Sequence, residues 1–197
     1  MAANLPVQKT PMNLQSNPMS SRNQKRRKAG ASISKILLWL FVINLGIALG
    51  AGLYEARIEF PQWLIALPES EYQWNGEAAR QANTGLRFWV YVTTVPLTLL
   101  TLANAIAAWR SRGVLRRWWL GAAGTAAADR LFTFTYFVPT MIKLMNGTLP
   151  ESQAVSTALQ WANLNHFRHI IVLTALLAAL KAFSLLHQRT TSQTHQI

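Results

Sequence analysis

The sequence predicts an all-α protein, namely a four-transmembrane-helix antiparallel bundle with a disordered basic N-terminal tail. The first observation is that 51% of the residues are hydrophobic and that they gather in four long stretches. Each stretch is long enough to cross a bilayer, because about 20 helical residues rising ~1.5 Å each span a ~30 Å hydrocarbon core. The second observation is that basic residues concentrate on one side of such a bundle. The predicted spans are residues 36–56, 88–109, 118–145 and 159–186.

The positive charge of the chain follows the loops. The formal net charge is +12 at pH 7, and most of the basic residues precede the first span, occupy the short second loop or flank the end of the fourth span. These regions fall on one side of a four-span chain, so the positive-inside rule predicts that both termini lie in the cytoplasm. Because the charge reports topology, we do not expect a nucleic-acid partner. The residues concerned are Lys9, Arg22, Lys25, Arg26, Arg27, Lys28, Lys35, Arg110, Arg112, Arg116, Arg117, Lys181 and Arg189.

The ends of the chain differ from its middle. Residues 1–33 contain prolines, many Asn, Gln and Ser, and a basic cluster, but no hydrophobic period, which predicts a disordered cytoplasmic tail. Residues 34–188 form the predicted transmembrane domain, and residues 189–197 a second cytoplasmic tail. The first apolar stretch is longer than that of a cleaved signal peptide, so we expect it to remain as an anchor. Membrane lipid is therefore the first predicted partner.

The connections between the spans differ in length. The outer loop, residues 57–86, carries Trp63 and Trp74, which predict a segment on the outer membrane face with a short interfacial helix over residues 61–67. The loop at residues 110–117 is short, so spans two and three are predicted to be antiparallel neighbours. The chain has no cysteine, which excludes disulfides and thiolate chemistry. Small residues predict close helix packing; they include Gly46, Gly50, Gly52, Gly121 and Gly124.

Several polar side chains lie inside the predicted spans, where they are costly and face the bundle interior. Counting the helical rise from the aromatic residues at the membrane boundaries places all of them at or above the midplane. We therefore expect a single cavity in the outer half of the bundle. The polar residues are Glu55 in span one, Asp129 and Arg130 in span three, and Asn163, Asn165, His166, Arg168 and His169 in span four.

Helical spacing puts these residues on shared faces. Thr125, Asp129, Thr133, Tyr136 and Thr140 recur at steps of three or four and form one stripe of span three. In span four a second face combines the amide of Asn165, the guanidinium of Arg168 and the imidazole of His169. The candidate catalytic residues are His166, His169, Arg168 and Asp129. The candidate substrate-binding residues are Glu55, Arg130, Tyr136 and Asn165.

One interpretation of these charges is structural. Asp129 would pair with Arg168, and Glu55 with Arg130 or Arg57, so that neutralised charges hold the bundle in register. The two histidines favour chemistry instead, because imidazole is the usual proton carrier near neutral pH. Both interpretations stay open from the sequence.

A metal site is a minority alternative. Two imidazoles and two carboxylates, from His166, His169, Glu55 and Asp129, would suit iron or zinc. The neighbouring arginines would place positive charge beside the cation. We therefore predict no metal and no cofactor, with iron or zinc as the alternative.

Short segments of the chain resemble the anthrone-oxygenase-like family of four-span membrane proteins, many of them known only as a domain of unknown function. The similarity covers about residues 37–186. It implies importance for Glu55, for Tyr136-Phe137 with Pro139, and for the last segment. The segments are Gly52-Leu-Tyr-Glu-Ala-Arg57 with Phe60-Pro-Gln-Trp63, Arg87-Phe-Trp89, Trp109-Arg110 with Arg116-Arg-Trp-Trp119, Phe134-Thr-Tyr-Phe-Val-Pro139, and Trp161-Ala-Asn-Leu-Asn-His-Phe-Arg168.

A few fungal relatives of that family oxidise an anthrone to an anthraquinone without a tightly bound flavin or haem. The resemblance thus implies a cofactor-independent oxygenase acting on a small hydrophobic, aromatic or quinone-like ligand. Its chemistry needs a base (His166 or His169), an oxyanion partner (Arg168 or Arg130) and a donor such as Tyr136. The alternative is a non-enzymatic membrane scaffold or accessory subunit. A transporter is a third, weaker reading, since four spans would form a path only as a homo-oligomer.

Overall fold

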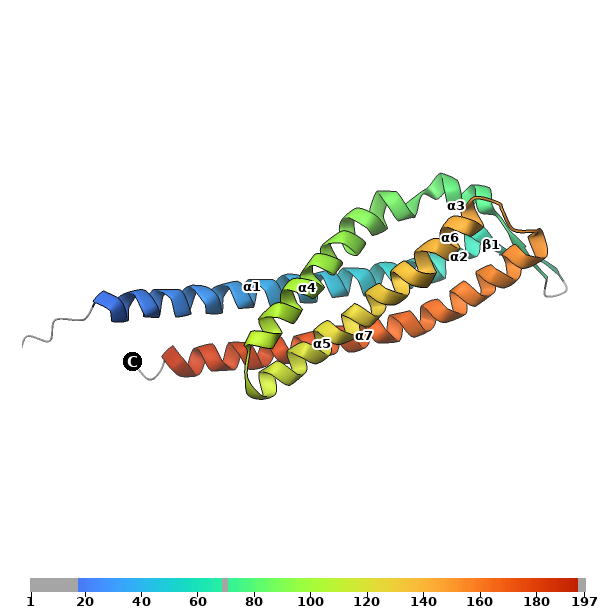
Figure 1. The fold of residues 1–197 in the computed structure, drawn as a ribbon. Helices are drawn as coiled ribbons and strands as arrows, with labels where there is room; N and C mark the ends of the chain where they lie inside the picture. Colours follow the sequence, from blue (N-terminus) through green and yellow to red (C-terminus); the bar gives the residue numbers. More distant parts are fainter. Residues whose placement is uncertain (1–17, 69–70, 195–197) are drawn as a thin grey trace, which may run out of the picture. The chain divides into compact units, whose positions relative to one another are not determined.

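The computed structural model describes residues 18–68 and 71–194, and most of these residues are helical (Figure 1). The connection between the first two apolar stretches contains the two short strands. In chain order the elements are α1 (Pro18–Tyr54), η1 (Glu55–Glu59), α2 (Phe60–Trp63), β1 (Leu64–Ala66), β2 (Tyr72–Trp74), α3 (Gly76–Ala82), η3 (Gly85–Thr94), α4 (Val95–Arg110), α5 (Gly113–Phe132), η4 (Thr133–Phe137), α6 (Val138–Met145) and α7 (Glu151–Thr194). The elements labelled η are π-helices.

The chain divides into two compact units, residues 1–33 and residues 34–197. In the first unit α1 begins at Pro18, so part of the segment predicted to be disordered is helical. Residues 1–17, which carry the rest of that prediction, lie outside the described residues. At the other end of the chain α7 continues to Thr194, within the predicted second tail.

Within the described residues, three helical runs are long and apolar enough to cross a membrane, which indicates an integral membrane protein. They are Ser32–Trp63 (run one), Gly85–Arg110 (run two) and Glu151–Gln188 (run four). The third predicted span lies in a continuous helical run over Gly113–Met145 (run three), which is not among them. Asp129 and Arg130 interrupt the apolar sequence of run three and lower its hydropathy.

Runs three and four point in opposite directions, and so do runs two and three. In runs three and four, Arg168 bonds Asp129 and Trp161 bonds the carbonyl of Phe137, so the order of the contacts reverses along the chain. Runs two and three reverse at the turn between Arg110 and Gly113. The helices α4, α5 and α7 lie side by side (Figure 1). This pairing places residues far apart in sequence at the same level.

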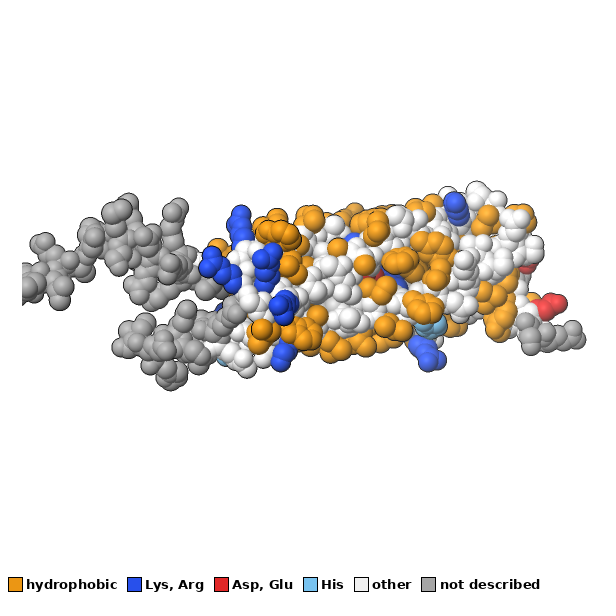
Figure 2. Space-filling model, turned by 60° about the horizontal axis from the view of Figure 1, so that its bottom comes forward, with side chains coloured by type: hydrophobic (Ala, Val, Ile, Leu, Met, Phe, Trp, Pro, Cys, Tyr) orange, Lys and Arg blue, Asp and Glu red, His pale blue; other side chains and the backbone are white. Residues whose placement is uncertain are grey.

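The second unit has two apolar cores. The arginine-end core lies between the helices near the α4–α5 turn and contains Leu38, Phe41, Leu45, Leu97, Trp119, Ala122 and Ala175, among others. Lysine and arginine side chains gather at this end (Figure 2); Arg110, Arg112 and Arg117 are exposed there. The hairpin-end core lies beneath β1 and β2 and contains Phe60, Trp63, Phe137, Leu144, Ala158 and Trp161.

The long connection after run one folds onto the hairpin-end core. The expected interfacial helix is only the four residues of α2, after which the chain extends into β1 and pairs antiparallel with β2, Leu64 opposite Trp74. Packing explains the early end of the helix, because the hairpin carries Trp74 back to the bundle. Its indole donates to the carbonyl of Leu144 at 3.0 Å. Phe60 stacks on Trp161 with ring centroids 5.1 Å apart.

Each π-helix is followed by a proline at the second position after its end, namely Pro61, Pro96 and Pro139. Proline has no N–H, and its ring clashes with the carbonyl four residues earlier. A widened turn before the proline relieves this clash, and polar side chains bond the carbonyls that are released. Asn44 does so from run one: its Nδ2 donates to the carbonyl of Val92, four residues before Pro96, at 2.9 Å.

Candidate functional site

The candidate site is centred on Asp129, which is 1% exposed near the end of α5. One carboxylate oxygen accepts from Nε of Arg168 at 3.0 Å, and the other accepts from Nε and Nη2 of Arg130. The predicted pair of Asp129 and Arg168 is therefore confirmed. A carboxylate so deeply buried needs opposite charge, since an unpaired one costs several kcal/mol.

Aromatic rings hold the guanidinium of Arg168 from two sides. Its central carbon lies 5.7 Å from the ring centroid of Trp89 in η3 and 5.2 Å from that of Phe137 in η4. Such cation–π contacts are favourable where water is excluded. Nη1 also approaches Oδ1 of Asn165, one turn earlier in α7, at 3.5 Å. Arg168 is thus fixed by contacts from runs two, three and four.

Glu55, at the start of η1, joins run one to the same set of residues. It is buried, and its Oε1 accepts from the indole N–H of Trp89 at 2.8 Å. The expected ion pair of Glu55 with an arginine is absent among the described residues: Arg130 is bound to Asp129, and Arg57 is exposed. The indole takes the place of a cation. These contacts form a chain of side chains with members in all four runs. We call this set of residues the polar network; in order of contact it consists of Glu55, Trp89, Arg168, Asp129 and Arg130.

The two histidines are neighbours on α7 but differ in burial. His169 is buried against run one, where a Cβ added to Gly52 would lie only 2.7 Å from its Nε2. Gly52 therefore forms the notch that admits the imidazole. His166 is exposed, and its ring centroid is 6.3 Å from that of His169. One helical step rotates a side chain by ~100°, which turns His166 away from the face of Asn165. The expectation that both histidines share one cavity needs this correction.

Some polar atoms beside the network have no partner. Within the described residues, Nη1 of Arg130, Nδ2 of Asn165, Nε2 of His169 and the hydroxyl of Tyr136 are buried without a hydrogen bond. Each such group costs about 1–3 kcal/mol, so a cluster of them in a native protein calls for a partner. The first two atoms only donate, and the other two are able to donate. The complementary group is an oxygen acceptor.

The described residues do not support the iron or zinc alternative. Among them, no group of three or more His, Asp or Glu side chains is close enough to hold a metal ion. The predicted ligands have other surroundings: Glu55 bonds Trp89, Asp129 bonds two arginines, and His166 is exposed.

Sequence reasoning missed three polar contributors: Asn44, Trp89 and Asn104. Both asparagines lie inside apolar stretches, so the criterion that selected Asp129 would have found them. Asn104 is fully buried, donates to the carbonyls of Leu37 and Leu100, and accepts from Trp119. Trp89 belongs to one of the segments that carry the resemblance, Arg87-Phe-Trp89, but its residue type did not indicate a site, because an aromatic residue near a span end is ordinarily a boundary residue.

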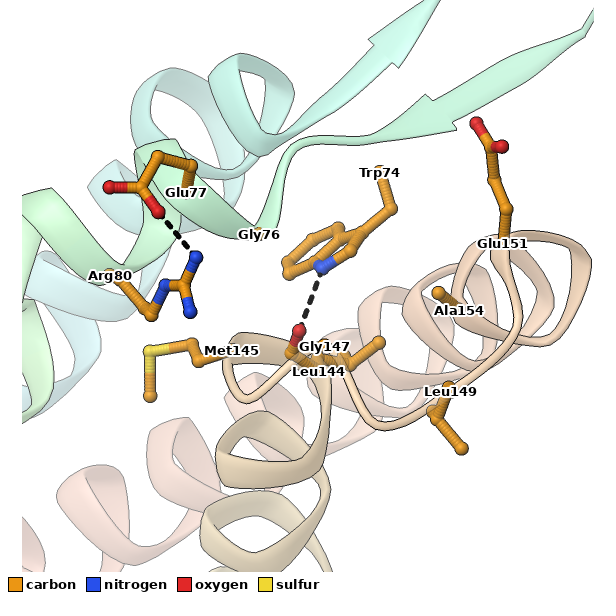
Figure 3. A pocket seen from close by; sticks show the side chains of 10 residues that line it. All are labelled: Trp74, Gly76, Glu77, Arg80, Leu144, Met145, Gly147, Leu149, Glu151 and Ala154. Atoms are coloured by element: carbon orange, nitrogen blue, oxygen red, sulfur yellow. Dashed lines mark hydrogen bonds and ion pairs between the residues drawn. The ribbon is translucent and has the colours of Figure 1, made fainter.

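An open cavity of about 310 Å³ lies at the hairpin end, between α3 and the turn into α7 (Figure 3). Trp74, Leu144 and Met145 form its apolar side, and Glu77 and Arg80 make an ion pair at its rim. Hydrogen bonds from Gln81 and Arg80 hold the pKa of Glu77 below its ordinary value. This cavity contains none of the predicted site residues.

Comparison of the chain with protein-family models, with curated proteins and with solved structures finds no match.

Proposed function

We propose that the chain is an integral membrane protein of four antiparallel spans, with both termini in the cytoplasm and the polar network in the outer half of the bundle. Three runs have the length and apolarity of spans. Run three packs against runs two and four, and the charged residues in its middle, Asp129 and Arg130, are buried, so they face protein and not lipid. The exposed arginines of the α4–α5 turn agree with a cytoplasmic location of that turn.

The polar network is the proposed binding site for a small hydrophobic, aromatic or quinone-like molecule. The observation that carries this proposal is that two residues bonded to the network, Arg130 and Asn165, each keep a buried donor without a partner, Nη1 and Nδ2. The network also contains aromatic rings, since Trp89 and Phe137 both lie against the guanidinium of Arg168. A planar ligand with a carbonyl oxygen offers the acceptor that these donors lack and a face for the rings.

The proposed reaction is the cofactor-independent oxygenation that the anthrone-oxygenase-like resemblance implies. His169 accepts a proton from the ring methylene group opposite the ligand carbonyl, and the donors of Arg130 and Asn165 hold the oxygen of the resulting conjugated enolate. Dioxygen then adds to the carbanion, and loss of water gives the quinone, so anthrone and dioxygen yield anthraquinone and water. Asp129 positions the two guanidiniums, and Tyr136 supplies a further donor.

A non-enzymatic scaffold is the second candidate, and one observation favours it. Both oxygens of Asp129 are already bonded by arginines that come from runs three and four. A buried cluster of mutually paired charges of this kind fixes helix register without any ligand. In that case the bundle serves as a membrane scaffold or accessory subunit.

The test compares His169→Ala with His166→Ala, two imidazoles on one helix with opposite burial. Oxygen uptake is measured with anthrone and detergent-solubilised protein, after subtraction of the protein-free rate. We expect His169→Ala to lose about 100-fold or more of the rate, with the variant still monodisperse, and His166→Ala to retain it. A wild-type protein that does not exceed the protein-free rate rules out anthrone oxygenation and leaves the scaffold.

A further inference from the structure

Trp89 is a partly buried member of the polar network, as Arg168 is, and it lies between two buried carboxylates. On one side its N–H reaches Glu55, and on the other its ring face covers the guanidinium that binds Asp129. Glu55, Asp129 and Arg130 are each less than one-tenth exposed, whereas Trp89 is partly exposed. The indole is therefore a partly exposed link between the buried carboxyl of Glu55 and the guanidinium that binds Asp129.

The segment that carries Trp89 has few attachments. Within the described residues, the side-chain hydrogen bonds that tie η3 to another run are those of Glu55 to Trp89 and of Asn44 to Val92. The segment is a π-helix of ten residues, with Gly85 at its start and Pro96 just beyond its end. Segments with few tertiary bonds open at low free energy, and residues at element ends absorb the movement.

We propose that Trp89 is a movable wall of the ligand site and that Glu55 is a positioning residue, which holds the indole closed. This inference rests on the proposed ligand site and names its entrance. Trp89 is four residues from the start of run two, or ~6 Å along the helix axis, so the entrance lies close to the membrane boundary. A planar ligand with acceptor oxygens enters there when the Glu55–Trp89 bond opens, and reaches the donors of Arg130 and Asn165.

The assignment changes the expected role of Glu55. As a candidate substrate-binding residue it would bond the ligand itself. In the structure its recorded bond is to the indole, so its effect on the ligand passes through Trp89. A glutamine at this position keeps an acceptor for the indole N–H, whereas an alanine removes it.

The absence of cysteine from the chain provides the experiment. Thr133→Cys places a thiol at a buried position one turn beyond Asp129, and Ala122→Cys places one in the arginine-end core. Labelling of each thiol by N-ethylmaleimide is followed by mass spectrometry of the full chain in nanodiscs. The first thiol reports opening of the site, and the second reports loosening of the whole bundle.

We expect Glu55→Ala and Trp89→Phe to label the Thr133→Cys thiol about tenfold faster, because each loses a hydrogen bond to a charged group. Trp89→Ala should be faster still, and Glu55→Gln should stay close to the parent. Trp109→Ala is the matched control, since Trp109 is an exposed indole that contacts Arg116 in the α4–α5 region.

Equal labelling of the Thr133→Cys thiol in all of these backgrounds would overturn the proposal. A parallel rise at the Ala122→Cys thiol would also overturn it, because the bundle as a whole would then have loosened. The labelling requires no substrate. Protection of the Thr133→Cys thiol by added anthraquinone tests the ligand site separately. The two results together distinguish failure of the proposed ligand site from failure of the proposed movement of Trp89.

Discussion

The arginine-end core and the polar network treat buried polar groups in opposite ways. Asn104 in the core uses both ends of its amide, with two carbonyls as acceptors and Trp119 as donor. In the network, Arg130 and Asn165 each keep a buried donor without a partner. A fully bonded polar group fixes a packing arrangement, whereas spare donors are a cost that a ligand relieves. The comparison separates a region built for stability from one suited to binding.

The backbone shows the same contrast. The helices α4, α5 and α7 are regular α-helices around the arginine-end core, where small residues such as Ala122, Ala175 and Ala179 allow close approach. Towards the network, runs one, two and three each widen into a π-helix. Such turns are frequent at functional sites. The π-helices therefore flank the network, whereas Arg130 and Asn165, which carry the unpaired donors, lie in the regular helices α5 and α7.

The largest effect is expected from Asp129→Leu, which leaves the guanidiniums of Arg130 and Arg168 buried without a counter-charge. We expect a loss of about 3–5 kcal/mol in the free energy of unfolding, seen as lower thermal stability in detergent. Replacing all three residues by leucine should recover most of this loss, because the two guanidiniums are then removed together with the carboxylate of Asp129. A single variant as stable as the parent would contradict the network as a stabilising element.

The two asparagines give the sharpest form of the comparison. Asn104→Leu leaves the indole N–H of Trp119 unpaired and should cost about 2 kcal/mol of unfolding free energy. Asn165→Leu removes one long bond and one unpartnered donor, so its change should stay within about 1 kcal/mol. Binding of anthraquinone, measured by calorimetry, should respond in the opposite order. Equal losses of stability would remove the distinction between the regions.

A smaller effect is expected from Gly52→Ala, whose Cβ would lie 2.7 Å from Nε2 of His169. Overpacking of this kind costs roughly 1–2 kcal/mol, and His169→Ala in the same chain should restore the stability. Gly50→Ala is the matched control, because nothing lies within 4 Å of a Cβ there. Equal thermal unfolding of the two alanine variants would argue against the imidazole notch.

The sequence predicted those features that follow from the cost of burying charge and apolar surface. All four apolar stretches lie in helices, and Asp129 pairs with Arg168, because a bilayer or a bundle interior leaves few other outcomes. The hairpin was not predicted, since β1 and β2 are three residues each and depend on packing against Leu144 and Trp161. The residue pattern within a short segment does not indicate contacts with residues far away in the sequence.

The site was predicted in part for the same reason. Helical spacing identified Asn165 and His169 as one face, and both are buried. Helical spacing could not predict whether His166 is buried, because this residue lies at the edge of that face. In the structure His166 is exposed. The bond of Glu55 to Trp89 joins residues 34 positions apart through a half-buried indole, and neither residue type demands the other.

The π-helices also shift the residue positions that face a given side of a run. A π-turn holds one residue more than an α-turn, so beyond it each side chain reaches a given face one position later. In run three the buried positions Asp129, Thr133 and Phe137 are four apart through η4. Removing one residue from η4 would make the helix regular and rotate everything beyond by ~100°, turning Leu144 away from its core. The surplus residue is thus a register device, through which the hairpin end of run three can vary without disturbing the arginine end.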